Sequence, residues 1–304
     1  MNLRHRLVAC ALVLVSLAGC HGAETACGED EYSAGFERIG VLRSTDGGAT
    51  WAFLGDACFH APELIPVDPS PLPTASGVAL YFLDLRSLNQ PAGAARVIYR
   101  AESRNGLEFN EPAPAFLFGE NITDPYILQL GASSYRMYLL HLAEVQDIIS
   151  ATSRDGLVFT LDEGSRTKEG AIPGALLLPD GRVRLFVAGD PRGIKSLISG
   201  DGLAFTMEEG LRIATDGIST TDPHPIRLRS GGYMMVYTVH REGTYADEQA
   251  RLAAIEIHIA ISADSFNWTV NPAPIAHGSV PGLVEATDGT LYTYYVDASH
   301  HRNP

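Results

Sequence analysis

The residues best able to do chemistry are carboxylates and histidines placed where predicted strands begin and end. Four carboxylates lie at or just before a strand start: Asp68, Asp124, Glu169 and Asp222. The other charged residues and histidines at strand starts and ends are Asp84, Arg86, His141, Asp190, Arg192, His224, His240, Arg241, His277, Asp297, His300 and His301. Carboxyl and imidazole groups commonly exchange protons in catalysis. The set therefore indicates either an acid–base site or a polar binding surface.

A turn motif that recurs five times predicts the elements that position these residues. Each copy reads Ser-x-Asp/Asn followed by Gly or Ser, with an aromatic residue a few positions later. The copies begin roughly 50 residues apart, at Ser44, Ser103, Ser153, Ser199 and Ser262. The segments between them are rich in β-branched and aromatic residues, which predicts strands; one short helix is expected within residues 246–254. The repeat predicts an all-β, five-bladed β-propeller with four-stranded antiparallel blades.

The two ends of the predicted propeller are incomplete in a complementary way. The chain begins with a third and a fourth strand, at residues 39–42 and 50–54, and ends with a first and a second strand, at 283–286 and 291–296. We expect these strands to pair as the last blade, which closes the ring and removes exposed sheet edges. The propeller is expected to cover residues 36–304, after a tether at residues 20–35.

The repeated turns are expected to be structural. Their Asp or Asn side chain caps turn amides, the glycine supplies a positive φ, and the aromatic residue packs between sheets. Because they follow the third strands, they lie at the opposite end of the blades from the inner-strand starts. The candidate residues should therefore gather around one mouth of the central channel. The long segments 86–95 and 241–253 fall on that same face.

The N-terminal sequence is typical of an export signal. Arg4 and Arg6 precede an apolar run over residues 7–17, which is too short to span a bilayer, so residues 1–19 are predicted to be a cleaved signal peptide. The sequence that ends at Cys20 resembles the bacterial lipoprotein processing box. That resemblance implies lipidation of Cys20 and a membrane-anchored protein that faces the periplasm or the cell surface. An ordinary secretory signal is the alternative.

The composition of the chain limits the classes of partner that it is expected to bind. The net charge of −14, without a basic run, argues against nucleic acid and fits a neutral ligand such as a sugar. The membrane is expected to be contacted only through the lipid anchor, and the chain is expected to be a monomer. Cys27 and Cys58 remain for an oxidising compartment, where a disulfide between them would clamp the closing blade.

Several short motifs resemble the five-bladed glycoside hydrolases of the arabinanase, xylosidase and invertase type. They are Asp-Pro-Ser at residues 68–70, Thr-Asp-Pro at 123–125, the repeated turns and the segment that begins at His277. The resemblance covers nearly the whole mature chain. It implies a carbohydrate ligand, with Asp68 as base or nucleophile, Asp124 as the residue that orients and tunes it, and Glu169 as acid.

Further residues follow from this resemblance and from the face on which they lie. His277 matches a histidine beside a channel ion in some members, which implies a site for calcium or another ion; the reaction itself requires no cofactor. The expected substrate-binding residues are Arg86, His141, Asp222, His224, His240 and Arg241.

Two hypotheses from different classes remain. Glycoside cleavage needs one carboxyl group held protonated and another ionised, and crowding of carboxyl groups raises the pKa of one of them. An exported glycoside hydrolase is the first hypothesis. In the family, however, the acid directly precedes Gly-Pro, whereas Ala171 and Ile172 separate Gly170 from Pro173 here. A surface-anchored propeller that binds carbohydrate or protein without catalysis is therefore the second. Sialidases share the turn motif, but they have six blades and an arginine triad that is not evident in this sequence.

Overall fold

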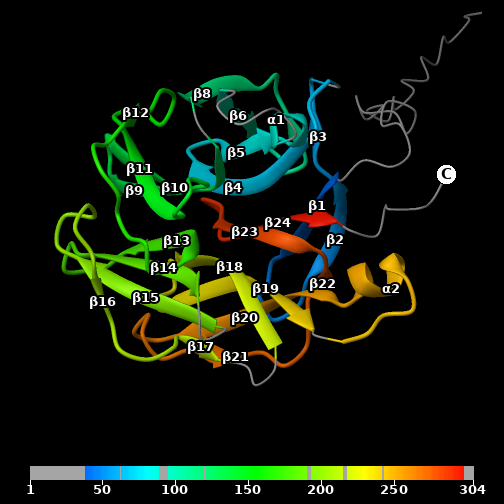
Figure 1. Cartoon of the computed structure of the whole chain (residues 1–304). Coiled ribbons are helices and arrows are strands. Elements are labelled where there is room, and N and C mark those ends of the chain that lie inside the picture. The colour runs from blue at the N-terminus through cyan, green and yellow to red at the C-terminus, as the bar shows by residue number, and fades with distance from the viewer. Residues whose placement is uncertain are drawn as a thin grey trace, which may run out of the picture.

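A computed structural model describes residues 38–61, 63–88, 95–119, 121–189, 193–214, 218–241 and 243–297. Over these ranges the chain forms five sheets around a common centre (Figure 1). Each sheet contributes one inner strand; they are β4 (Pro66–Thr74), β9 (Ile122–Gly131), β13 (Ala171–Leu177), β18 (Ile218–Arg227) and β23 (Ser279–Glu285). Each inner strand contacts the inner strands of both neighbouring sheets, so the five form a closed ring. The predicted five-bladed all-β propeller is confirmed.

Antiparallel second and third strands follow each inner strand. In the first four blades they are β5 (Gly77–Asp84) and β6 (Arg96–Ser103), β10 (Ser134–His141) and β11 (Asp147–Ser153), β14 (Val183–Gly189) and β15 (Gly193–Ser199), and β19 (Tyr233–Arg241) and β20 (Ile255–Ser262). The first and third strands of a blade run in the same direction, because the second strand lies antiparallel between them. The repeated turns, which end the third strands, therefore lie at the opposite end of the blades from the inner-strand starts.

The outer strands are shorter and more broken than the sequence predicts. In three blades the fourth strand is split into two pieces that both pair with the third strand; the pieces are β7 (Glu108–Phe109) and β8 (Ala113–Phe118), β16 (Thr206–Met207) and β17 (Ile213–Ala214), and β21 (Thr269–Val270) and β22 (Ala276–His277). In the second blade the outer strand is β12 (Thr160–Leu161). In the first blade, β3 (Cys58–Phe59) adds to β7 in parallel.

The ends of the chain form the fifth blade together. β1 (Arg38–Ser44) and β2 (Ala52–Asp56) join β23 and β24 (Leu291–Asp297) in the order β2-β1-β24-β23, which places the blue and red strands side by side in Figure 1. This confirms the predicted closure. Cys58, which follows β2, is disulfide-bonded. Its predicted partner Cys27 lies outside the described residues, as do Cys20 and the predicted signal peptide.

Helices are a minor part of the described structure. α1 (Leu85–Leu88) and α2 (Glu248–Ala253) are both inserted on the face where inner strands begin, and α2 matches the short helix expected from the sequence. Asp247 caps α2, because its carboxylate accepts the backbone N–H of Ala250 at 2.8 Å. Neither described helix has the length and apolar character needed to cross a membrane.

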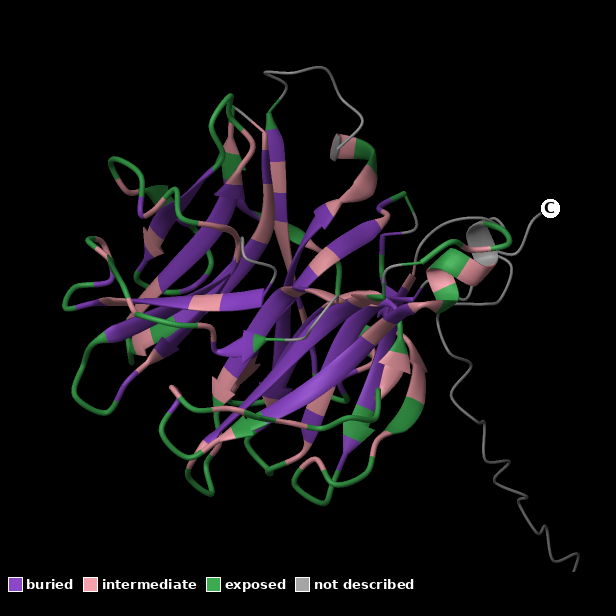
Figure 2. Ribbon diagram, turned by 60° about the horizontal axis from the view of Figure 1, so that its bottom comes forward, coloured by how far each residue is buried: buried purple, intermediate pink, exposed green. Residues whose placement is uncertain are grey.

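Buried residues lie mainly along the strands, whereas most residues of the connecting turns are exposed (Figure 2). Three fully buried tyrosines on second strands link neighbouring blades. The hydroxyl of Tyr81 donates to the carbonyl of Gly156 at 2.6 Å, and Tyr138 donates to Gly202 at 2.8 Å. Tyr294 donates likewise to Gly106 at 2.9 Å. Each glycine belongs to the repeated turn of the next blade, so the turns serve blade-to-blade packing.

Two blades lack this tyrosine. By sheet register the equivalent positions are Phe186 and Val236. Beside Phe186, the guanidinium of Arg184 donates to the hydroxyl of Ser265 at 2.5 Å, so the turn of the fourth blade is still held. Beside Val236, the side chain of Met234 packs close to Gly48 of the fifth blade's turn without a hydrogen bond.

Replacement of Tyr138 by phenylalanine should test the blade-to-blade contact. The variant leaves the buried carbonyl of Gly202 without its donor, which should lower the free energy of unfolding by about 1–2 kcal/mol. Tyr135→Phe is the matched control, because that half-exposed ring makes only a 3.4 Å contact with Gln129. Urea unfolding of both variants measures the difference; equal stabilities would contradict the assignment.

Candidate active site at the channel mouth

Every inner strand carries the same unusual backbone feature near its start. The residue before a proline has a left-handed φ between 50° and 56°; these residues are Asp68, Asp124, Ile172, Asp222 and Val280. Strand pairing shifts register at each of these places, as in a β-bulge, where the missing N–H of proline costs no ladder bond. A left-handed φ at β-branched Ile172 or Val280 is strained by about 1–3 kcal/mol. The ring therefore imposes this conformation whatever the side chain.

The five bulges surround one small cavity. Asp68, Asp124 and Asp222 line it together with Ile172, Val280 and the prolines that follow each of the five. The cavity measures about 20 Å³, which is room for one water molecule. It lies toward the starts of the inner strands, away from the repeated turns. The structure thus brings two of the three predicted catalytic residues, Asp68 and Asp124, together with two predicted substrate-binding residues, Asp222 and His224.

Asp124 has the most perturbed ionisation of the three. Its removal from water, together with the charges of Asp68 and Asp222, raises the pKa of the Asp124 carboxyl well above the ordinary value of 3.8. The hydroxyl of Thr123 donates to this carboxyl at 2.5 Å and opposes the shift only in part. The backbone N–H of Asp124 donates in turn to the carboxylate of Asp68 at 3.2 Å. Two adjacent inner strands therefore present carboxyl groups in different electrostatic environments.

Asp222 is held by a chain of hydrogen bonds. The hydroxyl of Thr221 donates to its carboxylate at 3.0 Å, and the backbone N–H of Val280 donates at 3.4 Å. Nε2 of His240 lies 3.1 Å from the same hydroxyl oxygen. Because the single hydroxyl proton goes to Asp222, Nε2 of His240 is the donor to Thr221. His240, a predicted substrate-binding residue, is thereby connected to the carboxylate group.

Arg96 is a residue of the site that the sequence did not indicate. It begins β6, is almost fully buried and donates to the side-chain oxygen of Asn121 at 3.0 Å. Removal from water lowers the pKa of its guanidinium, and the negative charge of Asp68 opposes that shift. Arg96 is thus the buried cation next to Asp68. The Thr-Asp-Pro repeat at Thr123 and Thr221 was a visible signal for the two threonines, whereas no sequence pattern marked Arg96.

Glu169 lies differently from the three aspartates. Its side chain is exposed, its backbone N–H donates to the hydroxyl of Thr167 at 3.0 Å, and it is not among the residues that line the cavity. Ile172 occupies the third blade's place in the ring. The role of Glu169 as acid stays a prediction.

Most of the other predicted site residues have local partners. Arg86 forms a 3.0 Å ion pair with Asp84, and Arg241 forms a 2.8 Å ion pair with Glu256. Nδ1 of His141 lies 2.9 Å from the carboxylate of Asp147. None of these lines the small cavity. Asp190, Arg192, His300 and His301 lie outside the described residues.

His277, the residue predicted to lie beside an ion, does not line the small cavity. His277 is exposed on β22. Across the described ranges, no group of three or more His, Cys, Asp or Glu side chains is arranged to hold a metal. The site for calcium or another ion stays a prediction.

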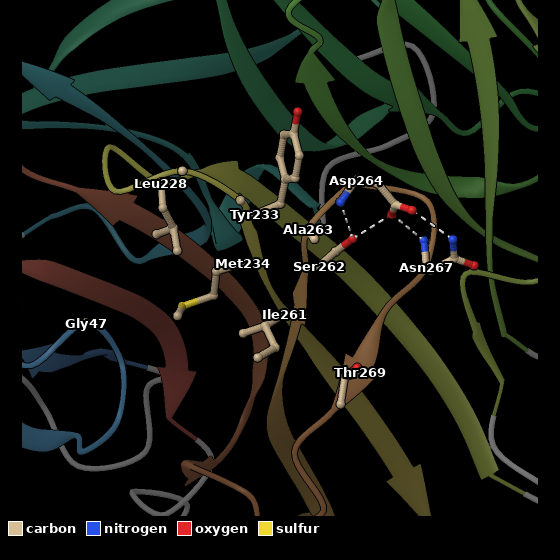
Figure 3. Close-up of a pocket in the computed structure, with 12 residues that line it drawn as sticks. Gly47, Leu228, Tyr233, Met234, Ile261, Ser262, Ala263, Asp264, Asn267 and Thr269 are labelled. Carbon is tan, nitrogen blue, oxygen red and sulfur yellow. Dashed lines mark hydrogen bonds between the residues drawn. The ribbon is translucent and has the colours of Figure 1, made fainter.

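A larger cavity, of about 740 Å³, lies on the opposite face between the fourth and fifth blades (Figure 3). Leu228, Met234 and Ile261 line it beside the turn that contains Asp264. The carboxylate of Asp264 accepts the backbone N–H groups of Phe266 and Asn267, each at 2.8 Å, which holds its pKa well below the ordinary value. Because these bonds occupy the acidic group of the turn, the cavity is a poor candidate for catalysis.

Comparison with known proteins supports the fold assignment. No protein-family model matches the chain, and no curated protein matches its sequence. A thermostable family-43 glycoside hydrolase superimposes with a TM-score of 0.57 at 15% identity, over 79% of this chain and 86% of that one. An endo-arabinase from Bacteroides thetaiotaomicron superimposes with a TM-score of 0.55 at 13% identity, over 75% of this chain and 88% of that one. A GH32 β-fructofuranosidase from Bombyx mori superimposes with a TM-score of 0.57 at 11% identity, over 78% of this chain and 55% of that one.

The chain has the fold of the five-bladed glycoside hydrolases. At these identities the likeness concerns the fold alone, and activity has to be argued from the residues at the channel mouth.

Replacement of Asp124 by asparagine should change how stability depends on pH. A pKa raised above the unfolded value of 3.8 means that the folded chain binds this proton more tightly, so the associated stability is lost as pH rises above about 4. Asparagine stays neutral at every pH. Asp124→Asn should therefore melt at a higher temperature than the wild type at pH 7, with the gap closing toward pH 4.

Asp155→Asn in the turn of the same blade is the control, because hydrogen bonds from the amide of Leu157 and its neighbours lower the pKa of Asp155. Its melting temperature should instead fall below that of the wild type at neutral pH, and this deficit should shrink as pH falls. Calorimetric melting at several pH values measures both; a deficit at pH 7 for Asp124→Asn would sink the interpretation.

Proposed function

We propose that this protein is a glycoside hydrolase that cleaves a glycosidic bond of a glycan at the channel mouth. The observation that carries the proposal is the pair of carboxyl groups on adjacent inner strands. Asp68 accepts a backbone N–H and lies near the buried cation Arg96, whereas removal from water and nearby charge raise the pKa of Asp124. Two carboxyl groups with separated proton affinities are what glycoside cleavage requires.

The two aspartates suit different steps. Asp68 would act as the ionised base or nucleophile, because Arg96 and the backbone N–H of Asp124 both favour its charged form. Asp124 holds its proton more tightly than an ordinary aspartate, which suits it to tune Asp68 or to supply the proton that the leaving oxygen needs. Asp222, fixed through Thr221, contributes charge that keeps the proton on Asp124.

A binding propeller without catalysis is the second candidate. It is favoured by the exposed position of Glu169 and by the apolar residue Ile172 at the third blade's place in the ring. On this hypothesis the same carboxylates and His240 would recognise a carbohydrate, or a protein, without breaking a bond.

The proposal includes the cellular location. The N-terminal sequence favours an exported lipoprotein that is lipidated at Cys20, and the disulfide-bonded state of Cys58 agrees with an oxidising compartment. In a bacterial host, Cys20→Ala should move the protein from the membrane fraction to the soluble exported fraction. An unchanged distribution on immunoblots of the fractions would exclude the lipid anchor.

Activity measurements separate the two functions. The mature protein should release sugar from at least one member of a broad panel of glycosides and polysaccharides. Asp68→Asn should lower that rate by about a hundredfold or more, since a positioned acid or base contributes at least this much. Glu209→Gln, which changes an exposed carboxylate outside the cavity, is the matched control and should keep most of the activity.

The outcomes are distinct. If the panel yields no sugar but isothermal titration detects a glycan, the binding propeller is correct. A large loss of activity in Glu169→Gln would confirm the predicted role of Glu169 as the acid, and an unchanged rate would reject that role. If neither hydrolysis nor binding is found, both functions are rejected.

A further inference from the structure

We infer that the back half of the central channel is a second binding site, which takes a small anion with an apolar body. A cavity of about 390 Å³ lies there, lined by the later residues of all five inner strands. Its volume lies within the range of small-molecule sites. Because each inner strand runs from the carboxylate mouth toward the repeated turns, this cavity opens on the opposite face from Asp68. The inference is independent of the proposed hydrolysis.

The wall of the cavity is mostly apolar. Each inner strand contributes apolar side chains; they include Leu72, Leu128, Leu176, Ile226 and Leu283. Such a surface gains free energy when a ligand displaces water from it, at about 25 cal/mol per Å² of apolar area. The wall therefore suits an aliphatic or aromatic group.

The inner end of the cavity is closed by an uncharged imidazole. His224 lines both this cavity and the small carboxylate cavity, so it separates the two. Its removal from water lowers the pKa of His224 to about 3, which leaves the ring neutral at physiological pH. Its ring centroid lies 4.6 Å from that of Tyr126, whose hydroxyl donates to the carbonyl of Pro225. The apolar part of a ligand should therefore point inward.

The outer rim carries the charge. Arg227 and Arg229 are exposed there, in a chain whose net charge is −14. The two nearby carboxylates already have partners: Glu285 accepts the backbone N–H of Arg229 at 2.7 Å, and Asp288 accepts that of Thr290 at 2.9 Å. The charge of Arg229 acts on Asp288, whereas Arg227 forms no ion pair with any described residue. Arg227 is therefore the cation available to an anionic group at the mouth.

Two fluorescent probes of the same shape and different charge test the site. Anilinonaphthalene sulfonate carries an anionic group on an aromatic body, and phenylnaphthylamine is its uncharged counterpart. The folded mature protein should bind one equivalent of each. Arg227→Gln should weaken the sulfonate roughly three- to fivefold, as expected for one exposed charge contact, and should leave phenylnaphthylamine unchanged.

A cavity-filling variant ties binding to this place. Leu177 is half-buried at the rim, so Leu177→Trp should fill part of the cavity and weaken both probes by about tenfold or more. Leu161→Trp is the matched control, since this exposed leucine of β12 lies outside the cavity and its variant should bind as the wild type does. Circular dichroism and melting confirm that each variant is folded.

Three results would overturn the assignment. Absence of saturable binding of either probe, or binding that Leu177→Trp leaves unchanged while the variant is folded, would show that the cavity is not a site. If Leu177→Trp does not fold, the affinity of Arg227→Gln for the sulfonate still tests the site, because Arg227 is exposed and its replacement should not disturb folding. Equal affinities of Arg227→Gln and the wild type for the sulfonate would refute an anionic ligand.

Discussion

The left-handed residue before a proline in each inner strand is the constraint on which the rest of the structure depends. It bulges each strand at the same height and turns five side chains toward one point. Neighbouring strands then approach so closely that only glycine fits after two of the prolines. A Cβ on Gly174 would lie 2.0 Å from the carbonyl oxygen of Pro223, and one on Gly282 would lie 2.3 Å from that of Pro69. The tight ring and the convergent carboxylates are thus consequences of one backbone arrangement.

Only the bulges at which the residue is an aspartate place an ionisable group at the centre of the ring. Asp68 and Asp124 are adjacent in the ring and Asp222 lies one strand beyond Ile172, so their negative charges share a confined space that holds little water. Removal from water and the charges of the other two aspartates favour a proton on Asp124, and the hydrogen bond from Thr123 opposes this only in part. Ile172 and Val280 hold the ring with apolar groups at the same strain. The fold therefore determines which positions face the centre of the ring, whereas the side chain at each position determines what chemistry that position can support.

The architecture was accessible from the sequence, because five turn motifs and strand-like segments between them repeat at a regular interval, and because the two half-blades at the ends complete each other. The positions of Asp68 and Asp124 followed from the same repeat. The left-handed φ did not, since a residue before proline normally prefers an extended conformation. Arg96 is the first residue of β6, a position that no repeat pattern marks, and the exposure of Glu169 depends on the path of the chain just before β13. Local patterns therefore predicted which strands carry the site, whereas burial and partner contacts required the three-dimensional structure.

The central claim is that removal from water and the neighbouring carboxylates raise the pKa of Asp124 well above its ordinary value. Nuclear magnetic resonance of carboxyl carbons, in protein labelled with ¹³C at aspartate, follows each titration directly. The account predicts one carboxyl resonance that titrates well above pH 4 and that is absent from the spectrum of Asp124→Asn. A protein in which every aspartate titrates at or below its ordinary pKa would contradict the account, because the channel mouth would then hold only ionised carboxylates at neutral pH.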